Sequence, residues 1–102
     1  MDLSQEAWSL KQAQTEGSLI IDVRTPEEYK TGHLLNSQLL DIQEPQTFFD
    51  NIKGFDKSRS YFIYCRSGSR SAMACQILKQ QGILNCFNLL GGILDWQGEI
   101  EK

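Results

Sequence analysis

The sequence predicts an α/β domain with a mainly parallel central sheet of four to five strands and helices on both faces. Two observations predict this class. Residues 19–23 and 61–65 are short, almost wholly apolar runs, as in strands that are buried on both faces. Such runs alternate along the chain with segments of helical pattern, which is typical of βα units. The length of 102 residues suits one domain over residues 1–102.

The expected strands follow from apolar runs bounded by turn residues. They cover residues 19–23, 38–42, 61–65 and 86–90. The run Tyr61-Phe62-Ile63-Tyr64-Cys65 predicts its strand most strongly, because aromatic and β-branched side chains favour a pleated, buried surface.

The expected helices begin at capping residues and first-turn prolines. Ser4 caps a helix to about residue 14, and Thr25 precedes Pro26 in a second helix closed by Gly32. Further helices are expected at 45–52 and 71–81, with a short one after Gly91-Gly92. The expected apolar positions of the first helix are Ala7, Leu10 and Ala13, with Trp8 unplaced, and those of the helix at 71–81 are Met73, Ala74, Cys75, Ile77 and Leu78.

Composition excludes several classes of function. A formal charge of −3, from 10 basic and 13 acidic residues, predicts neither nucleic acid nor an anionic membrane as partner. No apolar run is long enough to cross a bilayer, and the first residues lack the basic and apolar parts of a signal peptide. The three cysteines have neither disulfide nor zinc spacing, so we expect free thiols, a reducing cytoplasmic location and no metal.

The segment with the strongest chemical character follows the 61–65 strand. In parallel sheets ligands gather at the carboxyl ends of strands, where Cys65 stands. A helix N-terminus and arginines favour a thiolate, and a glycine-centred turn can point successive N–H groups at an anion. We therefore expect Cys65 as the nucleophile. The expected substrate-binding residues are Arg66, Ser67, Gly68, Ser69, Arg70 and Ser71.

Three blocks of the chain resemble the single-domain rhodaneses, a family of sulfurtransferases. The first block is Asp22-Val23-Arg24-Thr25-Pro26-Glu27-Glu28-Tyr29 with Gly32-His33-Leu34, the second is the loop from Cys65 to Arg70, and the third is Gly91-Gly92-Ile93-Leu94-Asp95-Trp96. In order and spacing they cover nearly the whole chain. One departure is Leu35-Asn36-Ser37, where the family commonly has a Pro-Gly-Ala run.

The resemblance implies a rhodanese-like fold and a thiosulfate sulfurtransferase that works through a persulfide on Cys65. A small anionic donor such as thiosulfate, or a persulfide, would supply the sulfur. A thiol, cyanide or a sulfur-accepting protein would take it, and neither a metal nor an organic cofactor is implied.

The remaining residues that could take part in chemistry are expected to have structural roles. Asp22 and Arg24 are expected to support the loop by bracing it or one another, and His33 to be a hydrogen-bonded structural residue. Cys75 and Cys86 are expected to be core thiols, with a resolving role as the alternative, and Trp96 to pack the last helix.

Two other functions stay open. A Cys-dependent phosphatase or arsenate reductase has five residues between Cys and Arg, whereas Arg70 comes one position early and Ser71 takes the expected place. A silent, rhodanese-like binding module is the other alternative, although silent members usually lack the cysteine. The segment from Lys57 to Leu94 carries five basic residues and no acidic one, which predicts a small-anion site within an acidic chain.

Overall fold

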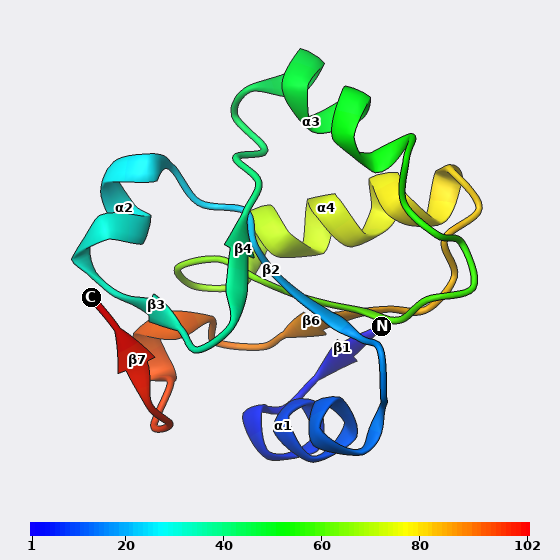
Figure 1. Cartoon of the computed structure of the whole chain (residues 1–102). Helices are drawn as coiled ribbons and strands as arrows, with labels where there is room; N and C mark the ends of the chain where they lie inside the picture. The colour runs from blue at the N-terminus through cyan, green and yellow to red at the C-terminus, as the bar shows by residue number, and fades with distance from the viewer.

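The computed structural model describes residues 1–102 and confirms the predicted α/β class. Its central sheet has five parallel strands in the order β1-β6-β5-β2-β4 (Figure 1). These strands are β1 (Asp2–Leu3), β2 (Leu19–Asp22), β4 (Ser37–Leu39), β5 (Tyr61–Tyr64) and β6 (Cys86–Leu89). Strands β3 (His33–Leu34) and β7 (Ile100–Glu101) form a separate antiparallel pair.

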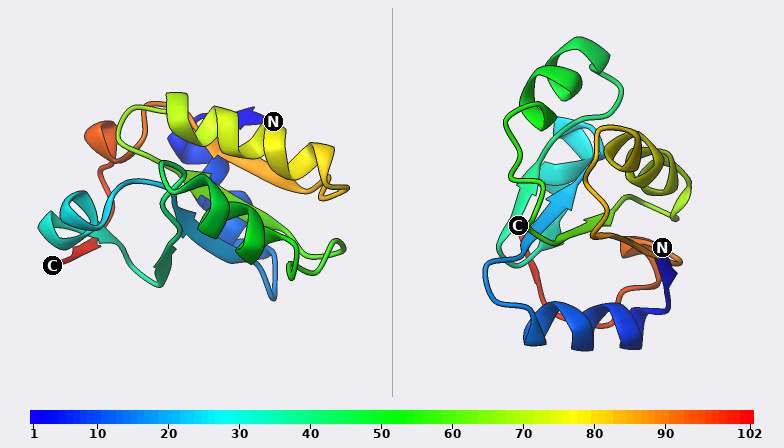
Figure 2. Two further views of the ribbon diagram at one scale, coloured as in Figure 1. Left: turned by 90° about the horizontal axis from the view of Figure 1, so that it is seen from above. Right: turned by 90° about the vertical axis from the view of Figure 1, so that its right-hand side faces the viewer.

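Helices cover both faces of the central sheet. They are α1 (Gln5–Gln14), α2 (Pro26–Thr31), α3 (Pro45–Ile52) and α4 (Ser69–Gln80), with a short 3-10 helix at Ile93–Asp95. Helices α3 and α4 lie on one side of the sheet and α1 lies on the other (Figures 1 and 2). The predicted caps are present: Ser4 accepts a hydrogen bond from the N–H of Ala7, and Thr25 forms a reciprocal capping box with Glu28. No helix is long and apolar enough to cross a membrane.

Each face of the sheet has its own apolar core, because successive side chains of a strand point to opposite sides. In β5, Tyr61 and Ile63 pack beneath α3 and α4, whereas Phe62 and Tyr64 pack on the α1 side. On the α1 side the central residue is Trp8, which is 1% exposed and meets the ring of Phe62 edge to face at 5.6 Å.

The structure corrects two predicted helix faces. Trp8 is the only buried residue of α1, and Leu10 is 59% exposed, so Ala7, Leu10 and Ala13 do not form the packing face. In α4, Met73 is 57% exposed, while Ala74, Cys75 and Leu78 are buried as expected. Both errors have one cause: periodicity weighs the residues of a helix alone, whereas burial depends on which sector meets the sheet.

Two strand predictions also change. The strand expected at 38–42 is only Ser37–Leu39, although the N–H groups of Leu40 and Ile42 still bond to the carbonyls of Asp22 and Val23. Strands β1, β3 and β7 were not expected. Each has two residues, too few to show an apolar alternation.

The strand order places the Cys65 loop at the point where the direction of strand addition reverses, between β2 and β5. From β2 the chain moves outward to β4, and from the adjacent β5 it moves the other way to β6. In such sheets a crevice opens beyond the carboxyl ends of the two strands at this reversal. Cys65 directly follows β5, and Val23 and Arg24 directly follow β2.

Candidate active site

The loop between β5 and α4 is a tight turn around one glycine. Gly68 has a φ of 111°, a conformation that side chains other than glycine rarely adopt, and it caps α4. The helix therefore begins at Ser69, two residues earlier than predicted, and Arg70 and Ser71 lie in its first turn. The predicted loop residues thus surround the N-terminus of α4, with Cys65 beneath it.

The Sγ of Cys65 is a buried hydrogen-bond acceptor. It accepts from the N–H of Gly68 at 3.1 Å and lies 3.3 Å from the hydroxyl of Ser71, and Cys65 is 1% exposed. Burial opposes ionisation of this thiol. Hydrogen bonds from the Ser71 hydroxyl and from the N–H groups of Ser71, Gly68 and Ser67 outweigh that effect, so the pKa of Cys65 is lowered.

The segment after β6 holds this loop from the opposite side. The N–H groups of Ile93 and Leu94 donate to the carbonyls of Cys65 and Arg66, both at 3.0 Å. A Cβ on Gly92 would clash with those same carbonyls, so only glycine allows the approach. The Cys65 loop and the Gly91–Trp96 block are therefore parts of one site, and the carbonyls of Cys65 and Arg66 are occupied by bonds to that block.

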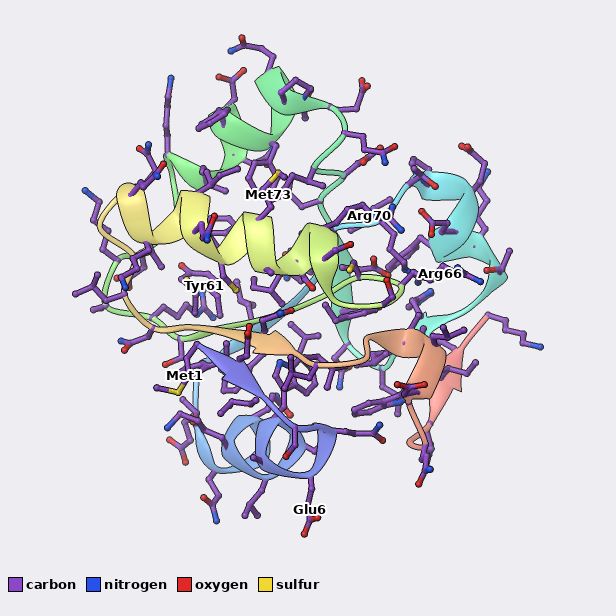
Figure 3. The ribbon with its side chains drawn as sticks, turned by 180° about the vertical axis from the view of Figure 1, so that it is seen from behind. Met1, Glu6, Tyr61, Arg66, Arg70 and Met73 are labelled. Atoms are coloured by element: carbon purple, nitrogen blue, oxygen red, sulfur yellow. The ribbon has the colours of Figure 1, made fainter.

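The two arginines of the loop have different surroundings. Arg70 forms a bidentate ion pair with Glu28 of α2, with N–O distances of 2.7 and 2.9 Å. The guanidinium of Arg70 holds the pKa of Glu28 at about 2. Arg66 is exposed and forms no ion pair. Both arginines lie on the side of the loop that faces α2 (Figure 3).

A hollow beside the loop is bordered by Arg66. It has a volume of about 320 Å³ and combines cationic and aliphatic side chains. Its lining is Arg24, Glu28, Thr31, Gly32, Arg66, Ile93, Leu94 and Ile100. The unpaired guanidinium of Arg66 is the lining group that is free to attract an anion.

Asp22 and Arg24 form a buried brace at the end of β2. The Nη2 of Arg24 lies 2.6 Å from the Oδ2 of Asp22 and also donates to the carbonyl of Gly32 at 2.8 Å. The hydroxyl of Tyr64 donates to Asp22 at 2.7 Å. Both charges are almost fully buried, so these bonds are what makes their burial tolerable.

His33 contacts Tyr29 and not the sulfur of Cys65. Its Nδ1 lies 3.0 Å from the carbonyl of Tyr29, and its ring stacks on that of Tyr29 with centroids 3.7 Å apart. These contacts connect β3 to α2 and place His33 in a supporting position.

Cys75 and Cys86 lie in the apolar core on the α4 side of the sheet. Burial raises the pKa of Cys75 to about 12 and that of Cys86 to about 11. The structure contains no disulfide, and no group of side chains there could hold a metal ion.

Sequence reasoning missed Asn88, Glu28 as a partner of Arg70, and the contact that Gly92 makes. Asn88 is the one polar residue of β6 and lies against the hydroxyl of Ser71. The signal for Asn88 was available: an amide within an apolar strand needs hydrogen-bond partners. Nothing local to Glu28 or Gly92 indicated their partners, which lie far away in the sequence.

Comparison with known proteins agrees with the fold. The family model described as rhodanese-like domain matches residues 5–99, and the chain belongs to this family. A sulfurtransferase of Allochromatium vinosum is 38% identical over 96 residues, which are 93% of this chain and 86% of that protein. A putative sulfur carrier protein of Bacillus subtilis is 32% identical over 98% of this chain but 52% of its own length.

Among solved structures, a rhodanese-like domain protein of Staphylococcus aureus superposes with a TM-score of 0.83 at 32% identity. The match covers 98% of this chain and 95% of that one. The predicted resemblance is thus confirmed, and relatives named as sulfurtransferases support a role in sulfur transfer.

Proposed function

We propose that the protein is a sulfurtransferase that carries sulfane sulfur as a persulfide on Cys65. The observation that supports this most directly is the setting of the Cys65 Sγ at the carboxyl end of β5, where a hydroxyl and backbone N–H groups converge on it. Such donors favour a thiolate at the start of the reaction. They also suit an anionic sulfur one bond further out once the persulfide has formed.

The reaction proceeds in two displacement steps. The Cys65 thiolate attacks the outer sulfur of thiosulfate, the new S–S bond forms, and the donor's own S–S bond breaks. Sulfite leaves with the electron pair of that bond. An acceptor thiolate or cyanide then attacks the outer sulfur of the persulfide, and the thiolate of Cys65 is released, so ping-pong kinetics follow.

The loop residues divide the work between them. N–H groups of Ser67, Gly68 and Ser71 bind the sulfur, with Ser69 beside them in the first turn of α4. Arg66 attracts the anionic donor, because it is exposed and has no carboxylate partner. Arg70, neutralised by Glu28, holds α4 against α2, and we assign it to positioning.

The acceptor in the cell is proposed to be a thiol, either small or on a protein. The name of the Bacillus subtilis relative, a putative sulfur carrier protein, makes a protein acceptor the stronger suggestion. All three cysteines are free thiols, and Cys65 must stay reduced to attack a donor. A reducing compartment such as the cytoplasm therefore suits the reaction.

Mass spectrometry of the intact chain tests this proposal. Incubation with thiosulfate should add one sulfur, about 32 Da, and cyanide should then remove it and form thiocyanate. Cys65→Ser should lose the gain entirely, whereas Cys75→Ala and Cys86→Ala should keep it.

Two other outcomes would replace the proposal. Hydrolysis of an aryl phosphate through Cys65, without any sulfur loading from thiosulfate or a persulfide donor, would indicate a phosphatase. A folded protein that neither loads sulfur nor hydrolyses phosphate would indicate a binding module.

A further inference from the structure

Asn88 is a buried polar residue of the parallel sheet. It lies in β6, is 2% exposed, and is flanked by the apolar Phe87 and Leu89. Burying an amide there is costly unless every polar atom is bonded. Neither the fold nor the proposed displacement steps require an amide at this position.

The hydrogen bonds of Asn88 determine which way its amide points. One side of the amide faces the carboxylate of Asp2 at 3.0 Å and the carbonyl of Gly68 at 3.2 Å. Both of these groups only accept, so the NH₂ group must occupy that side. The opposite atom, Oδ1, then faces the hydroxyl of Ser71 and can only accept from it.

The Ser71 hydroxyl has one proton and three acceptors within reach. They are the Sγ of Cys65 at 3.3 Å, the carbonyl of Gly68 at 3.2 Å and the Oδ1 of Asn88. The Gly68 carbonyl already accepts from Asn88 and from the N–H of Ala72, at 3.2 and 3.1 Å, which uses both its lone pairs. The choice for the Ser71 proton is therefore between Cys65 and Asn88.

We propose that Asn88 is a positioning residue of the sulfur-transfer site, which competes with Cys65 for the single proton of the Ser71 hydroxyl. When Cys65 is a thiolate, the hydroxyl turns to Sγ and leaves Oδ1 without a donor. When Sγ is neutral, as in the thiol or as the inner sulfur of the persulfide, the hydroxyl turns back to Asn88. The proton stays on Ser71 throughout, and only its hydrogen bond changes.

This competition, which rests on the proposed function, has a direction. Asn88 stabilises the states in which Sγ carries no charge, so it weakens the effect of Ser71 on Cys65 ionisation. It also favours loading, because the negative charge then moves from Sγ to the outer sulfur. Losing Asn88 should lower the apparent pKa of Cys65 by up to about one unit, the order expected for one hydrogen bond. The Gly68 carbonyl, which the loss of Asn88 frees to accept from Ser71, lies farther from that hydroxyl than Oδ1 does and replaces Asn88 only in part.

Other charged groups around the loop could also shift this ionisation, and the test must leave them unchanged. They are Asp2 on β1, Asp22 with Arg24 at the end of β2, Glu28 on α2, and Arg66 and Arg70 from the loop and α4. A double-mutant cycle on Ser71 and Asn88 substitutes none of them, and the loss of the hydrogen bond from Asn88 to Asp2 is common to both variants that carry Asn88→Leu, so it cancels in the cycle.

The experiment measures the rate of Cys65 alkylation by iodoacetamide against pH in the full chain. It uses the wild type, Asn88→Leu, Ser71→Ala and the double variant, with circular dichroism as the check on folding. Asn88→Leu should lower the apparent pKa of Cys65, and Ser71→Ala should raise it. In the Ser71→Ala background, Asn88→Leu should have no further effect. Cys86→Ala, on the same face of β6, is the matched control and should leave the Cys65 pKa as in the wild type.

An unchanged or raised pKa in Asn88→Leu, or the same shift with and without Ser71, would overturn the proposal. If Asn88→Leu does not fold, Ser71→Ala decides alone: an unchanged Cys65 pKa there excludes the competition. Alkylation needs no sulfur donor, so these results are independent of whether Cys65 accepts sulfur from thiosulfate.

Discussion

Cys65 stands where β5 meets α4, whereas Cys75 and Cys86 lie in the core between α4 and the sheet. All three are almost fully buried, with exposures of 1%, 7% and 4%. Yet the pKa of Cys65 is lowered, whereas the pKa of Cys75 is raised to about 12 and that of Cys86 to about 11. Since all three thiols are buried, burial alone cannot explain the difference between their pKa values.

The difference lies in the direction of the neighbouring dipoles. Around Cys65 the N-terminus of α4 and the Ser71 hydroxyl present hydrogens to the sulfur. Around Cys75 no hydrogen bond compensates for burial, and Cys86 donates its own S–H to the carbonyl of Ile83 at 3.3 Å. A buried cysteine is favoured as a thiolate where hydrogen-bond donors of the backbone and of neighbouring side chains point at its sulfur.

The largest effect expected from this comparison is selective alkylation. At neutral pH in the folded protein, iodoacetamide should modify Cys65 about 100-fold faster than Cys75 or Cys86, because only the thiolate reacts. In denaturant the three rates should become equal. Peptide mapping by mass spectrometry measures all three in one sample, and faster modification of Cys75 than Cys65 in the folded state would contradict the assignment.

Arg66→Ala should raise the KM for thiosulfate about tenfold, because the free guanidinium of Arg66 attracts the anionic donor. Stability should change little, because Arg66 is exposed and forms no ion pair. Arg66→Lys should reverse part of the increase in KM. Steady-state kinetics with thiosulfate and cyanide measure it. Unchanged KM values in Arg66→Ala would mean that backbone N–H groups alone recognise the donor.

The smallest expected effect concerns the ion pair between Arg70 and Glu28. Glu28→Gln keeps an oxygen for the Thr25 cap but removes the charge facing Arg70, and should cost about 0.5–1 kcal/mol of unfolding free energy at pH 7. The pKa of Glu28 falls from 4.5 to about 2 on folding, so this stabilisation is present above pH 4.5 and is lost as the pH falls towards 2.

Urea unfolding at pH 7 and at pH 3 checks this expectation, since the difference between wild type and Glu28→Gln should shrink at the lower pH. Glu27→Gln is the control, because Glu27 is exposed in the same turn and makes no ion pair. A difference that stays constant with pH would show that the charge of Glu28 contributes nothing.

Much of the site was predictable because it is local in sequence. A strand, a glycine turn and a helix N-terminus follow one another within residues 61–71, and their order alone places Cys65 next to backbone N–H groups. The caps at Ser4 and Thr25 were predictable for the same reason, since each bonds within its own first turn.

The different roles of Arg66 and Arg70 could not be predicted from the sequence. The predicted basic character of the segment from Lys57 to Leu94 holds as a count, but Glu28, 42 residues before Arg70, neutralises that arginine. The buried position of Trp8 likewise depends on Phe62 and on the carbonyl of Phe87, which accepts from its indole N–H at 3.0 Å. These contacts form only when helices and strands that are far apart in the sequence pack against each other.

The sequence by itself determined the α/β class, the membership in the rhodanese-like family and the loop in which Cys65 stands, because apolar patterning and turn chemistry act over a few residues. Only the tertiary structure decided which arginine is free, why Gly92 must be glycine, and that Asn88 shares the Ser71 hydroxyl with the sulfur. Those facts depend on contacts between strands and helices far apart in the chain, and hydrogen bonds act only between groups that folding has brought within about 3 Å of each other.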